Sequence, residues 1–260
     1  MAVKTDPIAV FDSGVGGISV LRELVKLMPH ERFLYFGDSA NAPYGTRTTQ
    51  QVRQLTFEAA QKLMARGITA LVVACNTATA AAMEDLRAEY PNFIIIGIEP
   101  ALKPAVTRFP QGAVGVMATP VTLREEKMAR LIEKYPHPDL QLIPAPGLAE
   151  LVEAGLADTP QMDAFLTPLL ASYVGKLDAL VLGCTHYPFA AASIRRVLGP
   201  GTELFDGGAG TARETRRRLQ EKGLLYEGPG ELIMENSLQS PQILELSREL
   251  LNKKTEEDHG

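Results

Sequence analysis

The chain contains two cysteines, Cys75 and Cys184, and each follows an apolar run just before a segment of helical periodicity. The sequence around them matches without a gap, since residues 70–77 read ALVVACNT and residues 179–186 read ALVLGCTH. Two equivalent thiols can act as base and acid on opposite faces of one carbon, because the ordinary thiol pKa of about 8.5 lies near working pH. The pair therefore indicates inversion of a stereocentre by deprotonation and reprotonation.

The residues beside the thiols favour this chemistry. A helix N-terminus stabilises a thiolate, so we expect the pKa of both thiols to be lowered. Asn76, Thr77, Thr185 and nearby backbone N–H groups could hold an amino-acid carboxylate, and His186 could shuttle the proton of the second thiol. One Cys with His would instead indicate acyl transfer, and a buried cysteine without chemistry is the plainest alternative. The second, equivalent thiol favours the two-base interpretation.

Two polar turns follow the first two predicted strands. In the first, residues 12–17 (DSGVGG), Ser19 stands where a dinucleotide fingerprint requires glycine, and there is no Walker lysine. This turn can instead present Asp12, Ser13 and backbone N–H groups to a small anion, unless one of these side chains merely caps the helix. The second turn, residues 38–45 (DSANAPYG), is either a ligand loop or a plain Pro/Gly turn.

Apolar runs rich in β-branched residues alternate with segments of helical periodicity, which is typical of βαβ units. The predicted strands are residues 8–11, 32–36, 70–74, 93–98, 113–118, 141–143 and 179–182. The predicted helices are residues 17–28, 50–66, 78–90, 121–135, 162–173, 209–223 and 242–251. Strands without polar alternation indicate parallel sheets covered by helices on both faces. Ligands bind beyond the carboxyl ends of such strands, so both cysteines should face the site.

The match between the two halves predicts the domain organisation. We expect an α/β fold of two pseudo-symmetric lobes, each a mainly parallel sheet flanked by helices, with the active site between them. Residues 1–97 and 208–260 are assigned to the first lobe, and residues 98–207 to the second. The helix at residues 209–223 should pack back on the first lobe.

Composition excludes several classes of protein. The 260 residues are 45% hydrophobic and 22% charged, with a formal net charge of −5 and no basic block that could follow a nucleic-acid backbone. No apolar run approaches the roughly 20 residues that span a bilayer, and two cysteines cannot form a Cys-rich metal site. We therefore expect a soluble cytoplasmic protein with no nucleic-acid or membrane partner and no metal.

Four motifs in order carry a family resemblance over roughly residues 5–225. They are DSGVGG at 12–17, DSANAPYG at 38–45, ACNTAT at 74–79 and GCTHYP at 183–188. Together they closely resemble the glutamate racemase family. The resemblance implies a cofactor-independent isomerase that interconverts L- and D-glutamate and supplies D-glutamate for peptidoglycan synthesis, and thus for cell-wall biogenesis and cell shape.

The resemblance also implies roles for individual residues. Cys75 would be the base toward D-glutamate and Cys184 the base toward L-glutamate; Asp12 would assist the first thiol, and Glu153 and His186 the second. Without the resemblance, Glu153 would be an ordinary solvated glutamate on a helix face. The implied substrate contacts are Asp12, Ser13, Tyr44, Gly45, Asn76, Thr77, Thr185 and His186, and Thr119 and Thr122 are expected near the same crevice. No role is implied for residues after Gly228.

Two other functions stay open at this point. Aspartate and hydantoin racemases share the two-thiol arrangement, and the pair Thr185-His186 after the second cysteine favours glutamate over them. A two-lobed amino-acid-binding protein is the alternative outside the enzymes, although binding alone needs no paired thiols. By analogy with the family, we also expect a homodimer.

Overall fold

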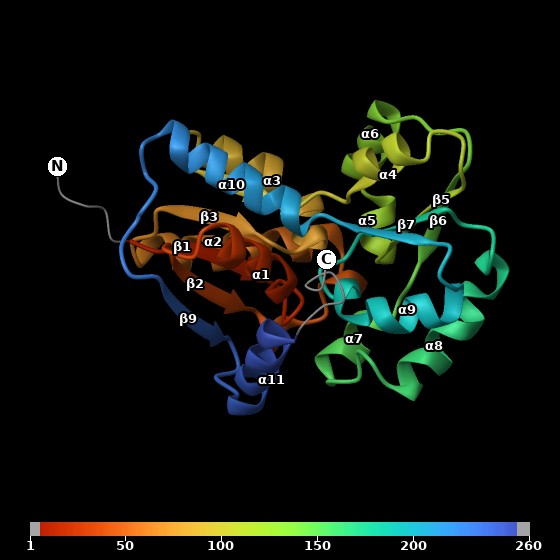
Figure 1. The fold of residues 1–260 in the computed structure, drawn as a ribbon. Coiled ribbons are helices and arrows are strands. Elements are labelled where there is room, and N and C mark those ends of the chain that lie inside the picture. Colours follow the sequence, from red (N-terminus) through yellow and green to blue (C-terminus); the bar gives the residue numbers. More distant parts are fainter. Residues whose placement is uncertain (1–5, 254–260) are drawn as a thin grey trace.

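The computed structural model describes residues 6–253, which form two α/β lobes around two parallel sheets (Figure 1). The first sheet consists, in spatial order, of β4 (Ile95–Gly97), β3 (Ala70–Val73), β1 (Ile8–Asp12), β2 (Arg32–Gly37) and β9 (Glu231–Asn236). The second consists, in spatial order, of β6 (Leu140–Pro144), β5 (Val114–Ala118), β7 (Ala179–Leu182) and β8 (Glu203–Asp206). The predicted α/β architecture with two parallel sheets is confirmed.

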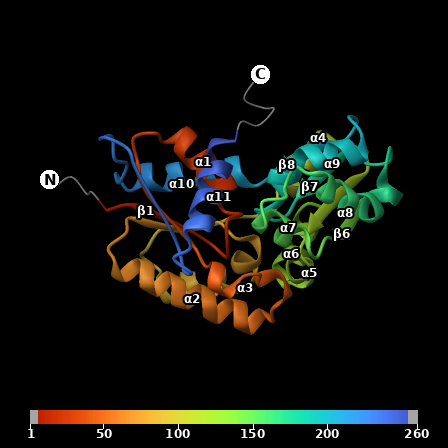
Figure 2. The same ribbon diagram turned by 90° about the horizontal axis from the view of Figure 1, so that it is seen from below.

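Helices cover both faces of the first sheet, as Figure 2 shows from below. They are α1 (Ile18–Leu27), α2 (Thr49–Ala65), α3 (Asn76–Glu89), α10 (Gly208–Glu221) and α11 (Pro241–Asn252), with short 3₁₀ turns η1 (Ser39–Asn41) and η2 (Tyr44–Thr46). Along β1, Ile8 and Val10 belong to the core under α1, whereas Ala9 and Phe11 belong to the core under α2 and α3. Burial on both faces explains the uninterrupted apolar sequence of this strand.

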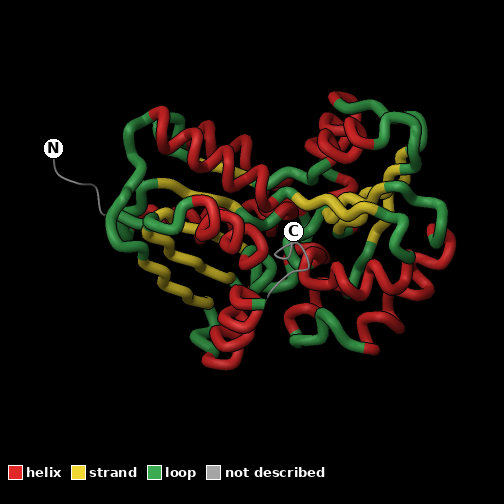
Figure 3. The backbone as a smooth tube through the Cα atoms, in the orientation of Figure 1, coloured by secondary structure: helices red, strands yellow, loops and turns green. Residues whose placement is uncertain are grey.

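The second sheet is covered in the same way (Figure 3). Its helices are α4 (Leu102–Arg108), α5 (Pro120–Arg124), α6 (Glu126–Lys134), α7 (Leu148–Glu153), α8 (Pro160–Leu170) and α9 (Ala191–Leu198), with 3₁₀ turns η3 (Ala171–Tyr173) and η4 (Tyr187–Ala190). The single helix predicted at residues 121–135 is wrong, because Glu125 has extended backbone angles (φ −69°, ψ 142°) and separates α5 from α6.

The chain crosses between the two sheets after β4 and again after β8. At the second crossing Gly207 packs directly on the first, since a Cβ there would collide with the carbonyl oxygen of Glu99. After this crossing α10 packs against α1, which confirms that the helix returns to the first lobe. The lobe boundaries assigned at residues 97/98 and 207/208 stay a prediction.

Strand register places the chemistry-bearing turns at one edge of each sheet. Asp12 at the end of β1 pairs with Gly37 at the end of β2, and Phe11 pairs with Val73, two residues before Cys75. The strand pairs of both sheets are parallel, so the turns that follow the strands of one sheet share its carboxyl edge. Within residues 6–253, no helix is long and apolar enough to cross a membrane.

Candidate active site

The carboxyl edges of the two sheets face a cavity of about 310 Å³. Side chains from both lobes line it, and ten residues singled out from the sequence are among them: Ser13, Tyr44, Gly45, Cys75, Thr77, Thr119, Glu153, Cys184, Thr185 and His186. Both thiols therefore share one cavity. The two thiols also interact electrostatically, because charge on Cys184 contributes to raising the pKa of Cys75.

Cys75 occupies the N-cap of α3, and its partners come from the first lobe. Its sulfur accepts the backbone N–H of Ala78 at 3.4 Å and lies 3.5 Å from the hydroxyl of Ser13. Burial, followed by the charge of Asp12, raises the pKa of the thiol to about 12. The expectation of a lowered pKa at this helix N-terminus is wrong for Cys75, because the loss of hydration outweighs the two hydrogen bonds. In this state Cys75 is a neutral acid.

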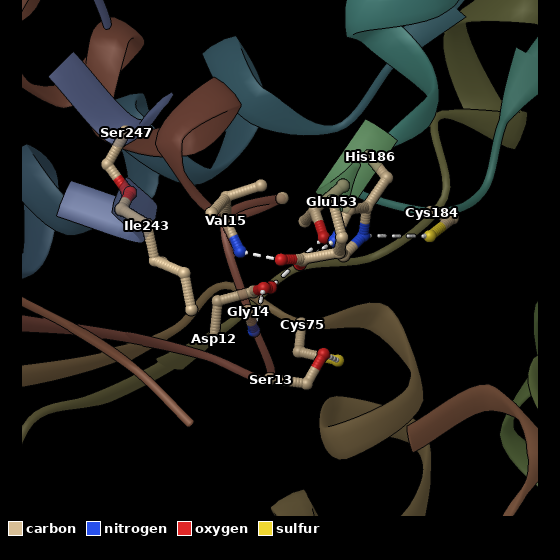
Figure 4. A network of polar contacts seen from close by, with 12 residues as sticks. Asp12, Ser13, Gly14, Val15, Cys75, Glu153, Cys184, His186, Ile243 and Ser247 are labelled. Carbon is tan, nitrogen blue, oxygen red and sulfur yellow. Dashed lines mark hydrogen bonds and ion pairs between the residues drawn. The ribbon is translucent and has the colours of Figure 1, made fainter. Parts of the chain in front are cut away.

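Cys184 is the first member of a chain of three groups (Figure 4). Its sulfur lies 3.7 Å from Nδ1 of His186, whose Nε2 lies 2.7 Å from Oε1 of Glu153. Burial lowers the pKa of His186, but the contacts with Cys184 and Glu153 more than offset this and hold it well above its ordinary value. For Glu153 burial raises the pKa, yet His186 and the N–H of Val15 leave it lowered. The result is an imidazolium and carboxylate pair beside the thiol.

Contacts between the lobes hold this chain against the glycine turn of the first lobe. The N–H of Val15 donates to Oε1 of Glu153 at 2.7 Å, and the hydroxyl of Thr185 donates to Oδ2 of Asp12 at 3.0 Å. A Cβ at Gly14 would collide with the Glu153 carboxylate, and one at Gly16 with the His186 ring. The glycines thus allow the second lobe to approach the backbone of this turn.

Asp12 lies behind the cavity wall and does not line it. It is fully buried, and its carboxylate accepts the N–H of Gly14 at 2.9 Å as well as the Thr185 hydroxyl. Burial raises the pKa of Asp12 more than the charge of His186 and these two donors lower it. A proton is therefore held more tightly on Asp12 than on an ordinary aspartate.

The loop at residues 38–45 supplies Tyr44 and Gly45 to the wall. The hydroxyl of Tyr44 donates to Oδ2 of Asp38 at 2.7 Å, and the amide of Asn41 donates to the same carboxylate. A Cβ at Gly45 would lie 2.9 Å from the methyl group of Thr119, so this loop also meets the second lobe closely. These side-chain hydrogen bonds tie Tyr44 and Asn41 to Asp38 within the loop.

Asn76 and Thr122 line a second cavity, of about 200 Å³, rather than the one that holds the thiols. The side-chain oxygen Oδ1 of Asn76 is buried and has no hydrogen-bond partner among the described residues. Thr122 reaches the first cavity indirectly, because its hydroxyl lies 3.2 Å from that of Thr77 and 2.9 Å from that of Thr119. The three threonines form a cluster in which both lobes take part.

The wall includes residues that the sequence did not single out. Ile243 comes from α11, and Figure 4 shows its side chain on the same side as the Asp12 turn. Ser39 also lines the cavity, and its hydroxyl has no hydrogen-bond partner among residues 6–253. The polar 38–45 motif signals Ser39, whereas the amphipathic pattern at residues 242–251 predicts a helix without indicating that it reaches the site. Glu150, one turn before Glu153, is an exposed part of the wall.

The chemistry that this site can perform is proton transfer. Its lining residues include two thiols, an imidazole and carboxylates, but neither lysine nor arginine. Within the described part of the chain, no group of three or more His, Cys, Asp or Glu side chains could hold a metal ion. Acid–base groups on two walls of one cavity suit the inversion of a carbon that lies between them.

Comparisons with known proteins give the family. A family model described as Asp/Glu/Hydantoin racemase matches residues 13–215. A glutamate racemase of Clostridium perfringens (strain SM101 / Type A) is 46% identical over 256 residues, which cover 97% of this chain and 98% of that protein.

Solved structures agree. A glutamate racemase from Thermus thermophilus, in complex with beta-chloro-D-alanine, has a TM-score of 0.79 and 37% identity over 97% of this chain and 95% of that one. A glutamate racemase from Francisella tularensis, in complex with D-glutamate, has a TM-score of 0.83 and 26% identity over 97% of this chain and 96% of that one. The resemblance read from the four motifs is therefore confirmed, and the chain belongs to the Asp/Glu/hydantoin racemase family, on its glutamate racemase branch.

Proposed function

We propose that this amino-acid racemase interconverts L- and D-glutamate with Cys75 and Cys184 as its two acid–base groups. The observation that carries the proposal is that both thiols line one cavity, one from the carboxyl edge of each sheet. A carbon held between two such groups loses its proton to one and gains a proton from the other on the opposite face. Inversion follows without any group leaving the substrate.

The reaction balances with one thiolate and one thiol. With D-glutamate, the thiolate of Cys75 takes the Cα proton, and the resulting carbanion takes a proton from the thiol of Cys184. With L-glutamate the roles reverse. His186, 3.7 Å from the Cys184 sulfur, exchanges a proton with this thiol, while Glu153 holds the imidazole in place. Asp12 serves as the buried carboxyl that assists Cys75, whose pKa responds to its charge.

Substrate binding adds a positive charge beside the thiols. The α-ammonium of glutamate, placed among the thiols, favours ionisation of Cys75, because an adjacent positive charge stabilises a thiolate. Its two carboxylates meet backbone N–H groups and hydroxyls rather than lysine or arginine. For these contacts we propose Ser13, Tyr44, Gly45, Thr77, Thr185 and His186, which line the cavity, with the Thr119 hydroxyl beside them. Asn76 and Asp12 do not line this cavity, and their contacts with the substrate stay a prediction.

The biological role follows from the product. D-Glutamate is a building block of peptidoglycan, so the enzyme serves cell-wall biogenesis and, through it, cell shape. We propose that it acts in the cytoplasm as a homodimer, as expected by analogy with the family. The test of assembly is the mass of the purified protein in solution, where a monomer at working concentration contradicts this part of the proposal.

The decisive experiment is proton NMR of each glutamate enantiomer incubated with the purified protein in D₂O. Wild type should exchange the Cα proton for deuterium and produce the opposite enantiomer. Cys75→Ser and Cys184→Ser should each reduce racemisation by at least about 100-fold, because an acid–base group contributes 10²–10⁴-fold. Circular dichroism and thermal unfolding should show that both variants keep the fold. Full racemase activity in either variant contradicts the two-thiol assignment.

Aspartate is the competing substrate. The same assay with L- and D-aspartate should give a far lower kcat/KM than with glutamate. Equal or faster exchange with aspartate contradicts glutamate as the substrate and leaves the two-thiol mechanism intact.

A further inference from the structure

We propose that Ser19, which lies outside the cavity wall, is a positioning residue that orients the Cys184–His186 segment from the opposite lobe. The inference rests on the proposed two-thiol function and adds a residue to it. Ser19 is in the first turn of α1 and is half-buried. Its hydroxyl oxygen lies 2.9 Å from the carbonyl oxygen of Thr185, across the contact between the lobes.

The position of this contact makes it relevant to the chemistry. The Thr185 carbonyl belongs to the peptide bond that joins Thr185 to His186, so Ser19 holds the backbone between the thiol of Cys184 and its imidazole partner. The same hydroxyl lies 2.9 Å from the carbonyl of Gly16 in its own turn. Ser19 therefore ties the second-lobe segment to the glycine turn on which it packs.

The two thiols differ in how they are held. The partners of Cys75, the hydroxyl of Ser13 and the N–H of Ala78, come from its own lobe. The partner of Cys184 is His186, and the groups around this pair are anchored across the lobes: Glu153 to the N–H of Val15, the Thr185 hydroxyl to Asp12 and the Thr185 carbonyl to Ser19. Glu153 and the Thr185 backbone, which lie next to the Cys184–His186 pair, are thus held across the lobes, whereas both hydrogen-bond partners of Cys75 come from its own lobe.

Among these anchors, Ser19 is the one whose substitution tests positioning without changing a charge. Val15 contacts the Glu153 carboxylate, and Asp12 is itself a carboxyl group that interacts with the charge of His186, so changes at these anchors alter the electrostatics of the site. Among residues 6–253, the hydrogen-bond partners of the Ser19 hydroxyl are both backbone carbonyls. Removing its hydroxyl alters how the Cys184 and His186 segment is held but adds or removes no charge.

Kinetics of three variants test the proposal. Ser19→Ala should lower kcat/KM for glutamate roughly three- to tenfold, as expected for the loss of one ordinary hydrogen bond. Ser19→Thr keeps the hydroxyl and should stay within about twofold of wild type. Ser247→Ala is the matched control, because Ser247 also donates to a backbone carbonyl, that of Ile243, but within α11 and without crossing the lobes. It should leave kcat/KM unchanged.

A direction-specific isotope effect separates positioning from a merely structural role. In Ser19→Ala, proton transfer by Cys184 becomes slower relative to the other steps. The primary isotope effect on kcat/KM should then rise with Cα-deuterated L-glutamate, whose deuterium Cys184 removes. With Cα-deuterated D-glutamate the isotope effect should fall. Cys75 removes this deuterium, and the slower reprotonation by Cys184 lets the carbanion return to substrate, so that the deuterium-transfer step limits the rate less.

Three results would overturn the inference: wild-type kinetics in Ser19→Ala, isotope effects that match wild type with both enantiomers, or an equal loss in Ser19→Thr and Ser19→Ala. Each can occur in an enzyme whose two cysteine variants are inactive, so this inference can fail while the proposed function stands. Conversely, full activity of Cys184→Ser removes the proposed function itself.

Discussion

Replacing Glu153 by glutamine removes the negative charge beside His186 but keeps an oxygen at nearly the same place. In the native structure Oε1 of Glu153 lies 2.7 Å from both Nε2 of His186 and the N–H of Val15. The glutamine oxygen can still accept these hydrogen bonds, so the substitution tests charge rather than shape. We expect the variant to be less stable, because His186 then carries its positive charge in a buried site without a counter-charge.

The expected loss is about 2 kcal/mol. A hydrogen bond to a charged group contributes about 1.5–3 kcal/mol and one between neutral groups about 0.5–1.5 kcal/mol, so neutralising the acceptor of two bonds removes about 1 kcal/mol from each. The Glu153 side chain is 23% exposed and that of His186 6%, so water screens the pair only partly. Glu153→Ala should cost more, because two buried donors then lose their acceptor.

The loss should depend on pH. The pKa of Glu153 is lowered, so its stabilising effect is present above its ordinary value of 4.5 and is lost as pH falls through the lowered value. The pKa of His186 is raised, so its effect is present below 6.5 and is lost as pH rises through the raised value. The difference between wild type and Glu153→Gln should therefore be largest between pH 4.5 and 6.5.

Urea unfolding followed by circular dichroism, repeated from pH 3 to 9, measures this difference. Glu150→Gln is the matched control, because Glu150 lies one turn earlier on α7 and is exposed. It should change the free energy of unfolding by less than about 0.5 kcal/mol. A difference for Glu153→Gln that stays constant from pH 3 to 9, or that equals the control, would refute the charged pair.

Two further outcomes are expected. Gly16→Ala should destabilise the fold by about 1–3 kcal/mol and reduce kcat, because the new Cβ would collide with the ring of His186. Thermal unfolding should show no such loss for the control Gly201→Ala, because Gly201 has open space around it. Wild-type stability of Gly16→Ala would contradict the close contact. In Asp12→Asn, iodoacetamide should alkylate Cys75 faster at pH 8, because burial and then the charge of Asp12 raise the pKa of the Cys75 thiol to about 12. Peptide mass spectrometry identifies the alkylated thiol. An unchanged rate would argue against an effect of the Asp12 charge on Cys75.

Much of the fold can be predicted from the sequence because its strands are buried on both faces. The apolar runs at residues 70–74 and 179–182 end within one residue of β3 and β7. By contrast, the sequence does not predict β9, because this strand lies at the outer edge of the sheet beside β2 and its sequence includes Glu231 and Glu235. The helical periodicity of residues 121–135 also continues through Glu125, so it does not indicate the break between α5 and α6.

Some residues of the candidate site can also be predicted from the sequence, and others cannot. Turns at strand ends are local features, so Ser13, Tyr44, Thr77 and both cysteines could be placed near one cavity from motifs alone. Contacts between segments that lie far apart in the chain could not be predicted from motifs. Ile243 reaches the cavity wall because the chain returns to the first lobe, where α11 packs against α1 and β9.

The sequence by itself determined that two equivalent thiols end two equivalent strands, because strand, turn and helix are set by residues close together in the chain. Only the tertiary structure decided what surrounds each thiol. Burial beside Asp12 raises the pKa of Cys75, and an imidazolium and carboxylate pair accompanies Cys184. It also joined Ser19 to Thr185, 166 residues away. Hydration and charge depend on neighbours in space, and the packing of the two lobes is what selects those neighbours.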